Sequence, residues 1–464
     1  TYLEPILFNT ACARGTQARM STEYISHVQD AEGVTTTCRD RLTEKEFTIR
    51  SKFLVGADGS NSKVAEHAGL TFAGRMGAAG SMNIIFKADL AKYVAHRPSV
   101  LYWVLQPGSN VGGIGMGLVR MVRPWNEWLI VWGYDINQPA PKVDNAFATK
   151  VARDLVGDPE LDIDIQSVST WTVNNMYATT MQSGRVFCMG DATHRHPPSN
   201  GLGSNTSIQD AFNLAWKLAY VLKGKAGPGL LDSYQVERAP IAKQIVTRAN
   251  KSIEEFGPIF KALGLLDSID PVKMQQNMDA RCDDTPAAEE QRRRIRETIA
   301  FKVYEFDAHG VEMNQRYRSK AVLTDGQKEP KFEKDAELHY QPTTWPGARI
   351  PHAWVFGEGG AKASTLDLCG KGRFTVFTGI GGKGWVDAAK VVGKELSVDI
   401  DAHVIGPRQQ WPDLTGEWAN QREVRDGGIV LTRPDQHVCW RHEAMVDDPA
   451  AELRASTYAL PRLR

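Results

Sequence analysis

The sequence predicts an α/β (α+β) protein built from several parts, and three stretches carry this prediction. Between residues 184 and 224, a short apolar run, a glycine-rich loop and a long amphipathic segment indicate a strand, a turn and a helix. Between residues 81 and 137, period-two patterns and apolar runs are typical of an antiparallel sheet. A second strand, glycine loop and helix are predicted to begin near residue 374.

The length and composition of the chain indicate a globular protein. A chain of 464 residues favours two or three domains, and its 42% of hydrophobic residues can fill a large core. The 55 basic and 55 acidic residues give no net charge, so neither nucleic acid nor an anionic membrane is predicted as a partner. The sequence shows no apolar run of membrane-spanning length and no secretory leader.

The cysteines are dispersed and form no C-x-x-C pair, which argues against a zinc site or a disulfide framework. They are Cys12, Cys38, Cys188, Cys282, Cys369 and Cys439. This usage fits a reducing compartment, and we predict a cytoplasmic protein.

The stretch from residue 184 to residue 224 has the clearest local pattern. Val186–Met189 predicts a buried strand, and Asp191 follows at its carboxyl end, where open α/β sheets place ligands. Prolines and glycines make the loop from 197 to 203 stiff and compact, and residues 204–207 are all competent N-caps. The predicted helix ends at Gly224. Its predicted buried face consists of Ile208, Ala211, Phe212, Ala215, Leu218, Ala219 and Leu222.

This pattern suits a ligand that becomes an anion. Glycines bring bare N–H groups to a helix start, where the helix dipole favours negative charge. Asp191 could accept hydrogen bonds from ligand hydroxyl groups. A purely structural reading, in which the acid caps a turn in a buried strand, turn and helix, stays open on these features alone.

The run GDATHRHPPSNGLGSNTSIQDAFNLAWKLA resembles the second FAD signature of the flavin-dependent aromatic-ring monooxygenases, the para-hydroxybenzoate hydroxylase class. Within that class it is most similar to the branch of dichlorophenol and phenol hydroxylases. The resemblance implies FAD as cofactor, NAD(P)H as co-substrate and molecular oxygen as oxidant. It implies that Asp191 holds the ribityl chain, that Pro198 lies beside the reactive ring edge, and that residues 203–205 offer N–H groups. The implied cofactor-binding residues here are Gly190, Asp191, Pro198, Gly201, Gly203, Ser204 and Asn205.

A second FAD contact is expected earlier in the chain. Residues 53–55 predict a strand, Asp58-Gly59 is a turn signal, and residues 60–62 can cap a short helix. An Asp-Gly pair after a strand is often only a hairpin turn. It also resembles the family's DG motif, which adds Asp58 and Gly59 to the cofactor site, although the motif usually closes with an arginine where this chain has Ala65. Three earlier strands are predicted at 23–27, 33–38 and 46–49.

The stretch from 81 to 137 predicts about four antiparallel strands, at 82–86, 100–105, 114–119 and 128–134. The resemblance implies that this sheet covers the substrate pocket. Aromatic residues gather here and suit a flat, apolar ligand, although aromatic residues in strands often belong to the core. Trp103, Trp132 and Tyr134 are the candidate substrate contacts.

The resemblance implies ortho-hydroxylation of a phenol, such as 2,4-dichlorophenol, to the corresponding catechol. A base that takes the phenolic proton would activate the ring, and no residue is assigned to this role beyond two candidates, His194 and His196. Their alternative role is that of hydrogen-bonded loop histidines. No metal site is predicted with Asp191, because prolines interrupt the cluster and no further ligand is near.

Beyond Gly224, residues 231–250, 253–265 and 287–303 predict helices. The segment DSYQVERAP matches the family's DSYxxERxP spacing, with Glu237 and Arg238 at its centre.

The last part of the chain contains a second candidate nucleotide site. A strand at 374–378 precedes Gly379–Gly384, which matches G-x-G-x-x-G, and Asp399 follows about twenty residues from the strand. An NAD-binding dehydrogenase is therefore an alternative function. Against it, the region is short for a Rossmann unit and closes with a predicted antiparallel pair near 429–435. The region also resembles the thioredoxin-like C-terminal domain of phenol hydroxylases without its Cys-x-x-Cys, which favours subunit assembly into a homo-oligomer.

These observations divide the chain into five parts. They are an FAD-binding part at 1–75, a substrate-binding sheet at 76–180, a second FAD-binding part with helices at 181–318, a linker at 319–346 and a thioredoxin-like domain at 347–464. The family's Rossmann-like FAD domain opens with a strand, G-x-G-x-x-G turn and helix, and we expect that this unit is missing upstream of residue 1. If it never existed, a flavin-free structural or assembly protein becomes the second alternative.

Overall fold

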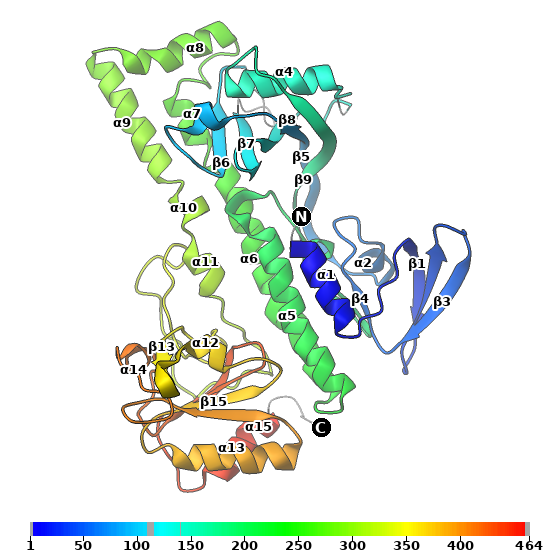
Figure 1. Ribbon diagram of the computed structural model, residues 1–464, viewed down its shortest axis with the longest axis vertical. Coiled ribbons are helices and arrows are strands. Elements are labelled where there is room, and N and C mark those ends of the chain that lie inside the picture. Colours follow the sequence, from blue (N-terminus) through cyan, green and yellow to red (C-terminus); the bar gives the residue numbers. More distant parts are fainter. Residues whose placement is uncertain (1–2, 109–115, 140, 460–464) are drawn as a thin grey trace. The chain divides into compact units, whose positions relative to one another are not determined.

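A computed structural model describes residues 3–108, 116–139 and 141–459 (Figure 1). The chain forms two compact units. Unit 1 comprises the residues up to Phe72 together with Ala178–His194, and unit 2 comprises Ala73–Tyr177 and the residues from Arg195 onward. These units differ from the sequence-based division, whose boundaries stay predictions. In the described ranges, no helix combines the length and apolar character needed to cross a bilayer.

Unit 1 contains two small sheets. The first is an antiparallel meander in the order β1-β2-β3, formed by β1 (Thr22–Gln29), β2 (Val34–Asp40) and β3 (Glu46–Ser51). The second has the order β10-β11-β4, formed by β4 (Leu54–Gly56), β10 (Gln182–Ser183) and β11 (Val186–Cys188), with β4 and β11 parallel. Helices α1 (Leu3–Ala13) and α2 (Lys63–His67) complete the unit. The strands predicted for this region are confirmed.

Unit 2 begins with a six-stranded sheet in the order β12-β9-β5-β8-β7-β6. The strands are β5 (Phe72–Lys87), β6 (Leu101–Leu105), β7 (Met116–Arg123), β8 (Glu127–Tyr134), β9 (Asp164–Ala178) and β12 (His194–Arg195). The four predicted strands are present, but residues 114–115 lie outside the described residues. The sequence missed β9 because its Ser, Thr, Asn and Gln residues hide any apolar alternation. Helices α3 (Ala91–Val94) and α4 (Asn145–Val156) belong to this part, and α4 packs its Val151 and Leu155 into the core beneath the sheet.

A helical region follows the sheet (Figure 1). Its helices are α5 (Gly203–Leu222), α6 (Asp232–Glu254), α7 (Gly257–Ala262), α8 (Pro271–Asp279), α9 (Pro286–Ala300), α10 (Val303–Phe306) and α11 (His309–Met313). The single helix predicted at 253–265 is wrong, because α6 continues to Glu254 and α7 starts separately at Gly257. Pro258 at the second position of α7 suits a helix start and not a helix interior.

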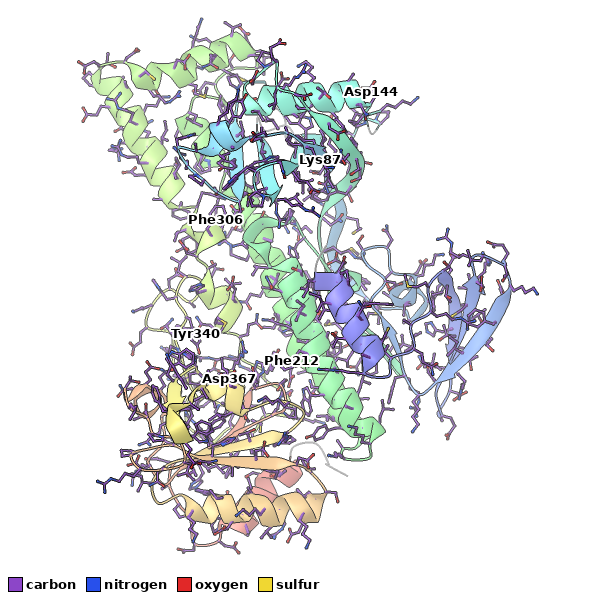
Figure 2. All side chains as sticks on the ribbon, viewed as in Figure 1. Lys87, Asp144, Phe212, Phe306, Tyr340 and Asp367 are labelled. Carbon is purple, nitrogen blue, oxygen red and sulfur yellow. The ribbon has the colours of Figure 1, made fainter. Side chains whose placement is uncertain are left out.

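The buried face of α5 differs from the prediction. Ile208 and Phe212 are 57% and 51% exposed, and Figure 2 shows Phe212 on this helix. The buried side chains instead include Asp210, Asn213 and Lys217. Apolar periodicity was misleading here, since α5 packs on α6 through ions and hydrogen bonds.

Buried charged side chains form a network of ion pairs between α5, α6 and the C-terminal part. Lys217 Nζ lies 2.8 Å from Glu237 Oε2, and Arg433 Nη1 lies 2.5 Å from Glu237 Oε1. Arg433 also pairs with Asp435 at 2.6 Å. All four side chains are at most 1% exposed. Burial opposes ionisation of Glu237, but the charges of Arg433 and Lys217 hold the pKa of this carboxyl below its ordinary value.

The C-terminal part has a four-stranded sheet in the order β16-β15-β17-β18. Its strands are β15 (Phe374–Thr378), β16 (Ile400–Val404), β17 (Ile429–Thr432) and β18 (Val438–His442). The strands β13 (Trp354–Phe356) and β14 (Lys362–Ser364) form a separate two-stranded sheet. Strand β15 is parallel to β16 and antiparallel to β17. The helices are α12 (Thr365–Leu368), α13 (Lys383–Leu396), α14 (Glu417–Gln421) and α15 (Pro449–Ala459). Residues 319–346, predicted as a linker, contain no helix or strand.

Candidate functional site

Two turns of unit 1 start at the same edge of the sheet β10-β11-β4. Cys188 at the end of β11 pairs with Gly56 at the end of β4, and Met189 N–H donates to the Gly56 carbonyl at 3.0 Å. The turn at Asp58 and the turn at Asp191 therefore both start from the carboxyl ends of neighbouring parallel strands. This is the edge at which open α/β sheets bind ligands.

The Asp58 carboxylate holds the start of α2. Ser62 Oγ donates to Asp58 Oδ1 at 2.5 Å, and Val64 N–H donates to Asp58 Oδ2 at 3.2 Å. Ser62 Oγ in turn accepts from Ala65 N–H at 2.9 Å, so the predicted N-cap is confirmed. Gly59 has a φ of +82°, a conformation that favours glycine.

Asp191 is an exposed residue at the carboxyl end of β11, within the turn η1 (Gly190–Ala192). Gly190 has a φ of +65°, and its carbonyl accepts from both Thr193 N–H at 2.7 Å and Thr193 Oγ1 at 2.9 Å. This turn presents the Asp191 side chain at the surface of unit 1. His194, one of the candidate bases, is by contrast fully buried.

In unit 2, the loop before α5 brings together the other predicted cofactor residues. Pro198 precedes the turn η2 (Ser199–Gly201), and both Asn200 and Gly201 have positive φ values, +63° and +62°. A Cβ built on Gly201 would have no neighbour within 4 Å. The space beside this turn is therefore open to a ligand.

Helix α5 begins at Gly203 without a side-chain cap. Residues 204–207 lie inside its first turns, so the prediction that they cap the helix is wrong. Instead, Asn205 Nδ2 donates to the Gly201 carbonyl at 2.8 Å and Ser207 Oγ to the Gly203 carbonyl at 3.0 Å. Within the described ranges, no atom accepts a hydrogen bond from the N–H groups of residues 203–205. These uncapped N–H groups, together with the helix dipole, fit the electron-rich edge of a flavin.

His196, the other candidate base, lies against this helix start. Its Nδ1 is 2.7 Å from the Pro197 carbonyl, so this nitrogen is the donor. A Cβ on Gly203 would lie 3.6 Å from His196 Cε1. The ring is therefore placed beside the first turn of α5.

The three candidate substrate residues do not lie on one face of the large sheet. Directly paired residues of an antiparallel sheet share a face. Trp132 pairs with Met82, a residue of the core beneath α4, and Tyr134 lies on the same face two residues on. Trp103 pairs with Leu118, which pairs with Val131, so it lies on the opposite face.

Trp103 has the environment expected for a ligand contact. Its ring centroid is 4.7 Å from that of Phe256, in the apolar cluster around α7. Its Nε1–H is buried and has no hydrogen-bond partner in the described structure. Further along the same face, Asn83 Oδ1 accepts from Trp171 Nε1 at 2.9 Å. This face offers an aromatic wall and an unused donor.

A group of buried polar residues near the loop was not predicted. Lys302 and Glu305 form an ion pair and are 7% and 6% exposed. Burial lowers the pKa of Lys302 and raises that of Glu305, while their pairing opposes both shifts. The Asn200-Gly201 pair, a frequent signal for positive φ, was the one indication that the sequence offered.

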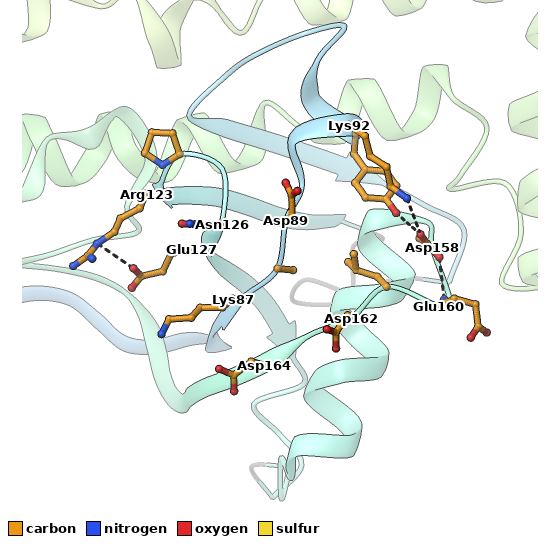
Figure 3. Close-up of a pocket in the computed structure, with 14 residues that line it drawn as sticks. Lys87, Asp89, Lys92, Arg123, Asn126, Glu127, Asp158, Glu160, Asp162 and Asp164 are labelled. Atoms are coloured by element: carbon orange, nitrogen blue, oxygen red, sulfur yellow. Dashed lines mark hydrogen bonds and ion pairs between the residues drawn. The ribbon is translucent and has the colours of Figure 1, made fainter.

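A surface groove lies elsewhere in the molecule (Figure 3). It has a volume of about 1030 Å³ and contains none of the predicted site residues. Two ion pairs lie in its wall, Arg123 with Glu127 at 3.1 Å and Lys92 with Asp158 at 3.8 Å.

The glycine loop at 379–384 does not form a dinucleotide site. A Cβ on Gly379 would lie 2.6 Å from the Asp426 carbonyl oxygen, and one on Gly382 would lie 1.8 Å from Thr378 Oγ1. Both glycines are therefore required by the close packing of this loop against its own surroundings. Asp399 immediately precedes β16, at the sheet edge opposite the loop, and pairs with Lys225 at 3.0 Å. The NAD-binding alternative is therefore wrong.

Two family models and several relatives match this chain. A model described as FAD binding domain matches residues 1–249, and one described as aromatic-ring hydroxylase, C-terminal, matches residues 343–460. The chain is 53% identical to 2,4-dichlorophenol 6-monooxygenase of Delftia acidovorans over 98% of its own length and 77% of that relative. It is 50% identical to phenol 2-monooxygenase of a Pseudomonas species over 98% of its length and 73% of that relative.

Solved structures of enzymes in complex with FAD are also similar to this chain. The flavin-dependent monooxygenase PieE, in complex with FAD and substrate, matches with a TM-score of 0.91 and 40% identity, over 99% of this chain and 78% of that one. Aklavinone-11 hydroxylase with FAD and aklavinone matches with a TM-score of 0.77 and 26% identity, over 99% of this chain and 77% of that one.

Proposed function

Because this chain belongs to the family of FAD-dependent aromatic-ring hydroxylases, we propose that it adds one oxygen atom ortho to the hydroxyl group of a phenol. It is an FAD-dependent monooxygenase that takes its electrons from NAD(P)H. The proposed substrate is a chlorophenol such as 2,4-dichlorophenol, and the product is the corresponding catechol. The observation that carries this choice is the identity of 53% and 54% to two 2,4-dichlorophenol 6-monooxygenases over nearly the whole chain.

The residues of the candidate site have distinct proposed roles. When bound, FAD would supply the acceptance of hydride from NAD(P)H and the activation of oxygen. The N–H groups of Gly203, Ser204 and Asn205 would stabilise negative charge at the pyrimidine end of the cofactor. Asp191 would accept hydrogen bonds from the hydroxyl groups of the cofactor's ribityl chain, and Pro198 would line the ring's side of the site.

The other turns take supporting roles in this proposal. Gly190 and Gly201 allow close approach of the cofactor through their positive φ values. Asp58 and Gly59 form the second cofactor turn, with Asp58 acting mainly through the start of α2.

The proposed substrate site lies on the Trp103 face of the sheet. Its aromatic wall would orient a flat phenol and exclude water, and the unused Nε1–H of Trp103 could donate to a ring substituent. We assign Trp132 and Tyr134 to the core under α4, because they lie on the other face. His196 is the better candidate base, since His194 is fully buried.

Two broader expectations belong to the same proposal. The C-terminal domain is thioredoxin-like, which its β16-β15-β17-β18 order supports, and it assembles the subunits into a homo-oligomer. All six cysteines are free thiols, which suits the cytoplasm.

The decisive experiment measures NADPH consumption and oxygen uptake by the FAD-loaded protein with and without 2,4-dichlorophenol. The expected result is a phenol-dependent increase in both, with a chlorocatechol as product. No increase with 2,4-dichlorophenol but one with unsubstituted phenol would overturn the chlorophenol assignment. No increase with any phenol would overturn the proposed function.

A further inference from the structure

The side chain of Asn200 is held at both of its ends. Its Nδ2 donates to the carbonyls of Tyr304 at 2.7 Å and Glu305 at 3.2 Å. Its Oδ1 accepts from Ser252 Oγ at 2.8 Å. Asn200 thus links the turn before α5 to α10 on one side and to the end of α6 on the other. Since the backbone of this residue has a φ of +63°, these hydrogen bonds also stabilise an unusual conformation.

Ser252 is the fixed point of this arrangement. It is fully buried, and its Oγ accepts from Arg248 Nη2 at 3.0 Å and Nε at 3.3 Å. Arg248 donates to the Ser252 oxygen through both of these nitrogens. The hydrogen of the Ser252 hydroxyl can therefore be donated to Asn200 Oδ1. The Ser252 carbonyl also accepts from Lys302 Nζ at 2.8 Å.

Arg248 and Lys302 are themselves held by acids. Arg248 pairs with Glu255 at 2.5 Å and with Glu337 at 3.0 Å, and Lys302 pairs with Glu305. The position of Ser252 is therefore determined by two charged side chains, Arg248 at its hydroxyl and Lys302 at its carbonyl.

The same helix end contacts the proposed substrate face. Lys302 Nζ lies 3.7 Å from the centroid of the Phe256 ring, and the ring centroid of Trp103 lies 4.7 Å from that of Phe256. A continuous set of contacts thus joins the turn at Asn200 to Trp103.

We infer that Asn200 and Ser252 are positioning residues for the cofactor, which fix the turn at 199–201 and thereby the direction of the N–H groups at the start of α5. Neither side chain needs to touch the cofactor in this role. The inference rests on the proposed function, because it assumes that FAD binds at this turn. Removal of either side chain would let the turn relax and weaken the hold on the cofactor.

The test uses the FAD-loaded, full-length protein and the variants Asn200→Gly and Ser252→Ala. Glycine adopts the positive φ without strain, so Asn200→Gly removes the hydrogen bonds but not the backbone conformation. The first readout is the rate of FAD release on dilution, followed by the rise of flavin fluorescence. We expect release about fivefold faster in each variant, which corresponds to about one hydrogen bond.

The second readout is coupling, the fraction of consumed NADPH that appears as catechol, which we expect to fall in both variants. The double variant should resemble the single ones, because both act on one chain of contacts. Thr247→Ala is the matched control, since this exposed hydroxyl on α6 donates to the Lys243 carbonyl of its own helix.

Release rates and coupling equal to wild type in both variants would overturn the inference. If Ser252→Ala does not fold, Asn200→Gly decides alone. A wild-type protein that retains FAD but shows no phenol-dependent turnover would contradict the proposed function, while the release rates would still test the positioning role.

Discussion

Two parts of this chain have the same local pattern of strand, glycine-rich loop and helix, and they differ in what fills the loop. At residues 186–222, the chain passes from β11 through the loop into α5, whose first N–H groups have no acceptor in the described ranges. At residues 374–396, the loop between β15 and α13 is packed against the backbone at Asp426. The first pattern leaves room for a ligand, and the second is occupied by protein.

The two helices are also held by different forces. The buried face of α13 is apolar, with Trp385, Ala388, Ala389 and Val392. The buried face of α5 carries Lys217, which pairs with Glu237, and Asp210, which pairs with Arg238 at 2.6 Å. Glycine spacing alone therefore does not identify a nucleotide site. The contacts made by the surrounding chain decide whether the helix start is available.

The largest effect is expected from Glu237→Gln. This change removes the carboxylate that compensates both Lys217 and Arg433, and an uncompensated buried charge costs about 3–5 kcal/mol. Urea unfolding would measure the free energy of unfolding. Glu254→Gln is the control, because this exposed residue of the same helix should shift stability by less than about 0.5 kcal/mol. Equal losses in the two variants would contradict the network's role.

The next largest effect is expected from Gly379→Ala, which tests how tightly the loop between β15 and α13 is packed against the protein. The added methyl group would lie 2.6 Å from the Asp426 carbonyl oxygen, and such overpacking costs about 1–3 kcal/mol. Thermal unfolding would report the loss as a lower midpoint. Gly229→Ala, which meets no atom within 4 Å, is the matched control and should leave the midpoint nearly unchanged.

Gly203→Ala makes the corresponding change in the first loop, with the opposite expectation. Its methyl group would have only an ordinary contact, 3.6 Å from His196, and alanine is favoured over glycine in helices. Stability should hold or rise, while the dissociation constant of FAD rises about tenfold because the methyl crowds the cofactor. Unchanged FAD affinity, measured by fluorescence titration, would argue that the cofactor does not approach Gly203.

The smallest expected effect is a pH dependence of stability that comes from His403 in unit 2. Burial lowers the pKa of His403 below its ordinary value, although a hydrogen bond to the Leu368 carbonyl opposes this. The unfolded chain then takes up a proton at a higher pH than the folded one, so stability falls as pH drops below the ordinary histidine range. We expect a loss of less than about 1 kcal/mol between pH 7.5 and pH 5.5. The variant His403→Phe should show a smaller dependence, and an equal slope in both proteins would exclude His403 as the cause.

Much of the fold followed from local patterns. The strands β4, β11 and β15 were predicted because short apolar runs between glycine and charged residues have few other uses. The family was confirmed because its flavin signature is long and contiguous in sequence. In contrast, β9 was missed because half-exposed Ser, Thr and Asn residues leave no apolar period to read.

The site was predicted less completely than the fold. The positions of Asp191 after a strand and of Gly203 at a helix start were predicted because strand ends and helix starts are readable from sequence. The contacts of Asn200 were missed because its partners, Ser252 and Tyr304, are far away in the chain. The split of Trp103 from Trp132 was missed because strand pairing, and not composition, assigns residues to a face.

The sequence by itself determined many of the strands and helices and the family to which the chain belongs, since both are written in short, contiguous runs of residues. Only the tertiary structure decided which of two similar glycine loops leaves its helix start free, and which face of α5 is buried. Packing and charge pairing between segments distant in the chain govern these outcomes, and the free energy of such contacts depends on positions that no local pattern specifies.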